Sequence, residues 1–296
     1  MAFALDPGTP IPEAVRRAAE EELRLIVMAL AGQAGLGPDE AAHESRKRTK
    51  KVRALLRLVR AELGDEVYRR ENRALRDAAR QLSALRDAWV LVETLDRLVT
   101  PPADDVSPEA VAALRAVLAA EHRSLQGDPG GGVQSRAATE FEQVLLRVPQ
   151  WPLRAKGWRA LEDGLKSVAR RGRAAMLKAR TQGRAEDFHE WRKQVKYLRH
   201  QFALLRDVWP GVLDAMESTA DEVGEVLGSD HDLAVLGARI GAEAAVDGGT
   251  KAELLRRVQE RRAEAQQRAI ALGRLLYAEK PSSLTRRLGK LWKVAA

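Results

Sequence analysis

The residues best suited to chemistry are cations that share a helical face and occur twice. The pattern H-E-x-R-K-x-x-K-x-x-R begins at His43 and again at His189, 146 residues later. On a helix that turns about 100° per residue, its basic side chains fall within one arc of roughly 120°. The first basic face comprises His43, Arg46, Lys47, Lys50 and Arg53. The second basic face comprises His189, Arg192, Lys193, Lys196 and Arg199.

An anionic ligand is the chemistry that this arrangement favours. Like charges three and four residues apart repel each other on a helix, so their presence in both copies indicates that an anion offsets the repulsion. Arginine forks and lysine point charges both suit phosphate groups. The alternative is the solvated face of an amphipathic helix, which accounts for most runs of charge.

The helix predicted after each basic face differs between the two copies. In the first copy Arg69, Arg73 and Arg76 lie on one face, and we expect them to join the phosphate-binding set. The matching face in the second copy is acidic, with Asp214, Glu217, Asp221 and Glu225. These acids would neutralise part of the second basic face, so we expect the first copy to be the stronger anion site.

Each basic face starts at a histidine that a predicted hairpin places beside an aspartate. Folding the chain at Gly64 brings His43 level with Asp87, and the corresponding fold in the second copy brings His189 level with Asp232. Such a carboxylate would favour the protonated ring, so anion binding should tighten as the pH falls towards 6. A purely structural pair fits equally well. A metal site is disfavoured because each cluster offers one His and one carboxylate, and no cofactor is expected.

Helices must position these residues, and the whole sequence is typical of helices. Ala, Leu, Arg and Glu dominate, aromatic residues make up 4%, and apolar residues recur at helical rather than strand spacing. We therefore predict an all-α chain of about ten helices. Their approximate ranges are 12–31, 39–63, 65–99, 108–125, 134–147, 157–181, 185–208, 211–243, 250–279 and 283–293.

The repeat divides this chain into two units within a single domain that spans residues 1–296. The first unit covers about 10–149 and the second about 155–296, with about five helices each. Such a repeat is too long for an ordinary solenoid, so two fused helical bundles are the better prediction. Four tryptophans, Trp151, Trp158, Trp191 and Trp292, are expected to pack inside these bundles instead of stacking on bases, because no aromatic residues interleave with the basic stripes. His122 and His200 are expected at the surface or at an edge.

Bulk composition agrees with a polyanionic partner. The formal net charge is +8, and the 45% of hydrophobic residues can bury a substantial core. The chain has no cysteine, which excludes disulfides and thiolate metal sites. No signal region and no apolar run of about 20 residues is present. We expect a cytoplasmic protein without a membrane partner.

The duplicated motif resembles the CHAD family, named for its conserved histidines and α-helical domain. The resemblance rests on both basic faces, on Arg86-Asp87 and on the segment 227–232, LGSDHD, and it extends from about residue 10 to the C-terminus. It implies two pseudo-twofold-related bundles around a basic central groove or pore that binds inorganic polyphosphate. It also implies association with polyphosphate granules, and it assigns phosphate binding to the ten residues of the two basic faces.

Three classes of function remain open at this stage. A non-enzymatic module for polyphosphate leads, with phosphate or sulfate ions as further ligands of the channel. Sequence-independent nucleic-acid binding would use the same charges but lacks aromatic platforms. An enzyme acting on phosphate esters or phosphoanhydrides could use the His–Asp pairs. The sequence has no P-loop and no carboxylate cluster for Mg²⁺, so we expect no enzymatic activity.

Overall fold

The protein is built from helices throughout the part of the chain that the structure describes. The computed structural model describes residues 3–82, 84–100, 107–126, 131–243 and 246–296, and these contain eleven α-helices, two 3₁₀ turns and no strand. The elements are α1 (Ile11–Leu30), α2 (Pro38–Leu58), α3 (Arg60–Gln81), α4 (Ala84–Leu98), α5 (Pro108–Gln126), α6 (Gly131–Arg147), η1 (Val148–Gln150), α7 (Arg159–Gln182), α8 (Ala185–Leu204), η2 (Arg206–Val208), α9 (Pro210–Ala242), α10 (Gly248–Leu276) and α11 (Pro281–Ala295). The prediction of an all-α fold is confirmed.

Local signals explain where many of these helices begin and end. Proline occupies the first turn of α2, α9 and α11, where a missing backbone N–H costs nothing. The Asp247 side chain caps α10 by accepting hydrogen bonds from Gly249 N and Thr250 N. Gly183 ends α7 with a φ of 66°, a left-handed conformation that favours glycine. Gly64, with a φ of 72°, forms the turn that folds α3 back along α2.

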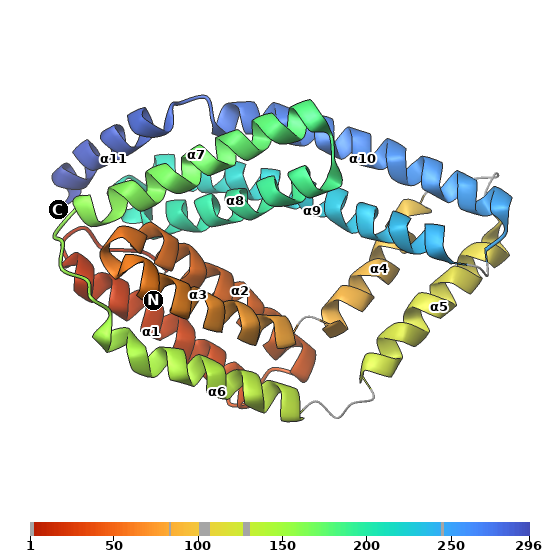
Figure 1. Cartoon of the computed structure of the whole chain (residues 1–296), viewed down its shortest axis with the longest axis horizontal. Coiled ribbons are helices and arrows are strands. Elements are labelled where there is room, and N and C mark those ends of the chain that lie inside the picture. The colour runs from red at the N-terminus through yellow and green to blue at the C-terminus, as the bar shows by residue number, and fades with distance from the viewer. Residues whose placement is uncertain (1–2, 83, 101–106, 127–130, 244–245) are drawn as a thin grey trace.

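The helices pack as neighbouring hairpins that meet at α2 and α8. Helix α1 packs on α2, α7 packs on α8, and α8 packs on α9. Helix α2 also packs against α8 and α7, so the helices that carry the two basic faces touch each other (Figure 1). Helices α3 and α6 cover the N-terminal bundle, and α11 packs on α7.

The main apolar core joins the N-terminal helices to α7, α8, the first half of α9 and α11. Among its largest fully buried side chains are Trp151, Trp191, Phe141 and Phe202. Trp158 and Trp292 are also buried and lie 6.1 Å apart between ring centroids. These four tryptophans therefore pack as expected. His200 is also buried, so the prediction that it lies at the surface is wrong.

A second apolar core lies at the other end of the molecule and combines segments from distant parts of the chain. Helices α4 and α5 there pack beside the far ends of α9 and α10 (Figure 1). Its members are Val92, Leu95, Leu98, Leu114, Leu118, Leu233, Leu236, Ile240, Val246, Leu254 and Val258. The second core thus draws on both predicted repeat units.

The helix predicted over 65–99 is in fact two helices. Helix α3 ends at Gln81 with Leu82 as its C-cap, and α4 starts at Ala84. Leu82 belongs to the main core, whereas Val92 belongs to the second core. The break lets the chain change direction between the two cores, a tertiary requirement that no proline or glycine in the sequence announces. In the second half, by contrast, α9 is one unbroken helix of 33 residues.

A glycine allows α7 to lie directly on the backbone of α2. A Cβ atom added at Gly164 would stand 1.9 Å from the carbonyl oxygen of Leu58 and 2.6 Å from that of Arg57. Backbone atoms cannot move aside as a flexible side chain can, so only glycine fits this crossing. None of the helices that the structure describes is long and apolar enough to span a membrane.

We predict that Gly164→Ala lowers the free energy of unfolding by about 3 kcal/mol, because the added methyl group must separate α7 from α2. Gly211→Ala is the matched control, since its Cβ would meet no heavy atom within 4 Å. Urea unfolding followed by circular dichroism measures both. A Gly164→Ala protein as stable as the control would contradict the close contact.

Candidate functional site

The packing of α2 against α8 brings the two basic faces together. Lys50 and Lys196 occupy matching positions of the repeat, and the charge of Lys50 acts on the ammonium group of Lys196. Close by, the Gln201 side-chain amide donates a 3.3 Å hydrogen bond to the carbonyl oxygen of Ala54. Residues nearly 150 positions apart in sequence therefore build one strongly cationic region.

Acidic residues of α9 pair with arginines of the second half. Arg199 lies 2.6 Å from Asp221 and 3.7 Å from Glu217, and Arg206 lies 2.6 Å from Asp214. The later arginine thus pairs with the earlier acid of α9, as expected for two antiparallel segments. The predicted neutralisation of the second basic face thus has a structural basis at Arg199.

The first basic face meets a neutral partner at the equivalent place. Arg53 donates through Nε to the Asn72 Oδ1 atom at 3.0 Å, and Arg57 donates to the same oxygen at 3.1 Å. Asn72 of α3 corresponds in the repeat to the acidic Glu217 of α9. An amide oxygen orients a guanidinium group without cancelling its charge. This partner therefore does not offset the charge of Arg53, whereas carboxylates offset the charge of Arg199.

Two glycines of α9 form a flat ledge on which cations of the second basic face lie. A Cβ atom at Gly228 would stand 3.0 Å from an Arg192 guanidinium nitrogen, and one at Gly224 would stand 3.8 Å from the Lys196 Cγ. The ledge leaves room for both side chains between α8 and α9 and holds them half-buried. These side chains are therefore more restricted than freely solvated cations.

The histidine of the second basic face has a second imidazole as its neighbour. The His189 and His231 rings are 4.4 Å apart between centroids, and Nδ1 of His189 is buried without a hydrogen-bond partner among the described residues. His231 immediately precedes Asp232 in α9, and the supporting role assigned to Asp232 beside His189 stays a prediction. The charge of Asp232 acts on Lys196, whose pKa it raises.

The first basic face also begins at a histidine. His43 is exposed on α2. The side chain of Asp87 lies outside the described part of the structure, and the supporting role assigned to it remains a prediction. Among the described residues no group of three or more His, Asp or Glu side chains could hold a metal ion.

The remaining lysines of the basic faces are exposed and lie beside the glutamate of their own motif. Lys47 is 3.4 Å from Glu44, and Lys193 pairs with Glu190 in the same i,i+3 relation. Exposed pairs of this kind contribute little stability, so either ammonium group can turn to a ligand at small cost. Arg46 is half-buried.

The three arginines predicted on the next helix, α3, lie beside acidic residues. Arg69 and Arg73 line a groove of about 730 Å³ between α3 and α6, together with Glu66, Asp77 and Glu140. Arg76 forms a 2.9 Å ion pair with Asp77. Asn72 of α3 contacts the first basic face through Arg53. Phosphate binding by Arg69, Arg73 and Arg76 stays a prediction.

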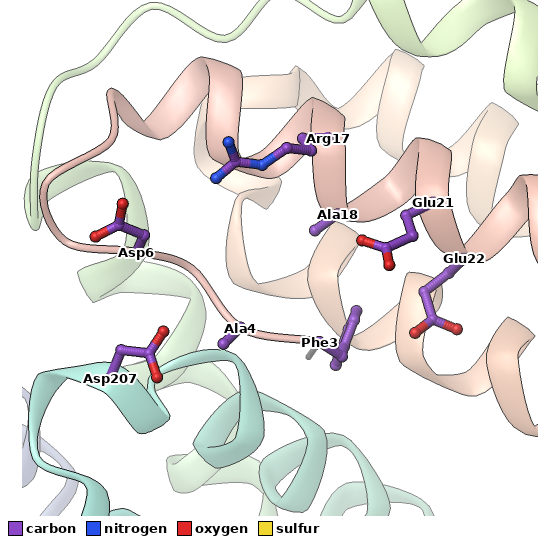
Figure 2. A pocket seen from close by; sticks show the side chains of 8 residues that line it. All are labelled: Phe3, Ala4, Asp6, Arg17, Ala18, Glu21, Glu22 and Asp207. Carbon is purple, nitrogen blue, oxygen red and sulfur yellow. The ribbon is translucent and has the colours of Figure 1, made fainter. Parts of the chain in front are cut away.

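Other cations of α2 serve the fold instead of a ligand. The buried carboxylate of Glu22 on α1 accepts hydrogen bonds from Arg48 at 2.9 Å and Lys51 at 2.8 Å. Glu22 also lines a small cavity of about 220 Å³ with Glu21, Asp6 and Asp207 (Figure 2). Carboxylates dominate this cavity, so it does not suit an anion. The helix therefore separates structural cations facing α1 from the first basic face.

Burial among like charges changes the protonation of the central groups. Burial, followed by the charges of Arg192 and Lys50, lowers the pKa of Lys196 to about 7, although Glu225 and Asp232 act in the opposite direction. Burial, and then His231, lowers the pKa of His189 below its ordinary value. Burial also lowers the pKa of His200 to about 3. Lys196 is therefore a group that titrates near neutral pH.

The sequence analysis missed Arg57 and Tyr197. The Arg57 guanidinium stacks on the Tyr197 ring, 3.7 Å from its centroid, and so links α2 to α8. Arg57 follows Arg53 by four residues and continues the first basic face by one turn, a signal that was present in the spacing. Its repeat counterpart is Ala203, so a search restricted to shared positions overlooks it.

Comparison with known proteins identifies both a family and a fold. The sequence model of the CHAD domain matches residues 17–241. Among solved structures, PptA from Streptomyces chartreusis aligns with a TM-score of 0.65, covering 92% of this chain and 100% of that chain at 13% identity. At this identity the likeness shows a shared fold and does not extend to ligands. No curated protein matches the sequence.

We predict that the amine of Lys196 half-titrates near pH 7 in the folded protein. Competitive labelling with acetic anhydride across pH 5 to 10, read by mass spectrometry of the peptide, measures this value. In urea the same lysine should return to about 10.4, because unfolding removes both the burial and the neighbouring charges. A folded-state value above 9 would show that Lys196 is solvated and away from Lys50.

Proposed function

The chain belongs to the CHAD family, and from this premise we propose that it binds inorganic polyphosphate through its two basic faces. The observation that carries the proposal is the contact between α2 and α8, which concentrates matching cations in one region. A linear chain of phosphates offers closely spaced negative charges without bases to read. Arginine and lysine side chains on two packed helices match such a ligand.

The proposal includes a central basic channel with approximate twofold symmetry. Lys50 and Lys196 are equivalent in the repeat and act on each other, as residues beside a twofold axis do. The acids of α9 make the two sides unequal, so the first basic face supplies most of the affinity. Phosphate or sulfate ions would bind the same channel weakly. Through polyphosphate binding, the protein would associate with polyphosphate granules in the cytoplasm.

We further propose that binding is not accompanied by hydrolysis. The cationic region consists of arginine, lysine and histidine, while the nearby acids are engaged with cations such as Arg199. Two-metal phosphoryl chemistry needs carboxylates that hold Mg²⁺ beside the phosphates. Release of orthophosphate from polyphosphate in the presence of Mg²⁺ would overturn this part of the proposal.

The main test combines titration with competition. We predict that the affinity for long-chain polyphosphate falls steeply with salt, with log K roughly linear in log[salt], and that duplex or single-stranded DNA at equal phosphate concentration competes poorly. Fluorescence titration at several salt concentrations measures both. Failure to bind polyphosphate, or equal binding of DNA, would sink the proposal.

The asymmetry is tested within the same assay. Replacing Arg46, Lys47, Lys50 and Arg53 together with Ala should weaken binding about 100-fold, at roughly 0.7 kcal/mol per contact. The matched variant, with Arg192, Lys193, Lys196 and Arg199 replaced by Ala, should lose only about 30-fold, because Arg199 is already engaged by acids and three contacts remain. Equal losses would contradict the unequal roles of the two faces.

The pH dependence is predicted to come from Lys196. Bound phosphate favours the charged amine and raises its pKa, so binding above pH 7 requires the free protein to take up a proton. Affinity should therefore fall as the pH rises from 7 to 9, by up to about tenfold per pH unit. Lys196→Arg, which stays charged, should flatten this profile while retaining the affinity at pH 6. An unchanged slope in that variant would exclude Lys196 as the titrating group.

A further inference from the structure

Three arginines gather at the C-terminal end of α2. Arg53 and Arg57 of α2 are linked because Arg57 donates a 2.9 Å hydrogen bond to the Arg53 carbonyl oxygen and both side chains bind Asn72. Arg171 of α7 is close enough for its charge to lower the pKa of Arg57, after the larger effect of burial. The three guanidinium groups come from two helices of different repeat units.

No carboxylate offsets this cluster within the described part of the chain. None of the three arginines forms an ion pair there, and the groups around Arg57 are the amide of Asn72 and the rings of Tyr68 and Tyr197. Other half-buried arginines, such as Arg199 and Arg262, pair with acids. Three guanidinium groups with neutral neighbours retain their charge and have unused N–H donors.

The cluster stands at a closed end of the first basic face. Helix α2 ends at Leu58, one residue beyond Arg57, and the backbone of α7 at Gly164 lies against the Leu58 carbonyl oxygen. Arg171 follows Gly164 by two helical turns, on the same face of α7. Helix α7 therefore crosses α2 at the end of the first basic face, beside Arg57.

We propose that Arg53, Arg57 and Arg171 form a subsite for the terminal phosphate of a linear phosphate chain. The inference rests on the proposed polyphosphate binding and specifies which part of the ligand this end of the site takes. A terminal phosphate has three non-bridging oxygens and, like a phosphate monoester, about −1.5 to −2 charges near neutral pH. An internal phosphate has two such oxygens and one charge. Three guanidinium forks match the terminal group.

Linear tripolyphosphate and cyclic trimetaphosphate provide the test, because the ring has no terminal phosphate. The wild-type chain should prefer the linear compound in isothermal titration at fixed ionic strength. Arg171→Ala should reduce the linear-to-cyclic affinity ratio about tenfold, since it removes one charge-assisted contact to the terminal group. Arg57→Lys should reduce the ratio similarly, because the ammonium group keeps the charge but loses the planar fork.

Arg170→Ala is the matched control, since it removes the same charge from the adjacent exposed position of α7. It should leave the ratio unchanged, and melting temperatures show that each variant is folded. If Arg171→Ala keeps the wild-type ratio, or if Arg170→Ala lowers it equally, the terminal subsite is wrong. If the wild-type chain binds long-chain polyphosphate without preferring the linear compound, this inference alone fails. If it binds no polyphosphate, the proposed function fails as well.

Discussion

Repulsion between two packed cationic helices is the constraint that the rest of the structure must satisfy. Helices α2 and α8 touch while facing like charges towards each other. Burial and the neighbouring charges of Arg192 and Lys50 together lower the pKa of Lys196. Their opposite faces hold them in place through buried apolar residues such as Leu55, Leu56 and Phe202. Fully burying each such side chain contributes about 1.5–3 kcal/mol. The apolar core thus stabilises an arrangement that the charges alone would separate.

Local sequence signals predicted most of the helices, but neither the break between α3 and α4 nor the contacts between helices. Helical spacing and capping residues predicted the all-α chain, and the duplicated pattern predicted both basic faces. The position of Asn72 opposite Arg53 could not be predicted, because it depends on the helix register set by Gly64 and the packing of α3. The ledge at Gly224 and Gly228 was missed for the same reason. The reason for a glycine inside a helix can be read only once the side chain packed against it is known.

Counting charges in the sequence also overstates what is available to a ligand. Arg48 and Lys51 belong to the same run as the first basic face, yet both are held by buried Glu22. At equivalent places of the repeat, Arg53 meets an amide and Arg199 meets carboxylates. A neutral amide partner in one half and carboxylate partners in the other therefore separate a cation whose charge is not offset from one whose charge is.

The unbroken course of α9 ties the two ends of the molecule together. It contributes Leu213 and Leu227 to the main core and Leu236 and Ile240 to the second core. Helices α4 and α5 of the first unit complete that second core, so neither half of the sequence contains all of its walls. The internal duplication is consequently no longer a pair of separable folding units. Cutting the chain between the repeats would leave each fragment with apolar surface that only the other fragment can cover.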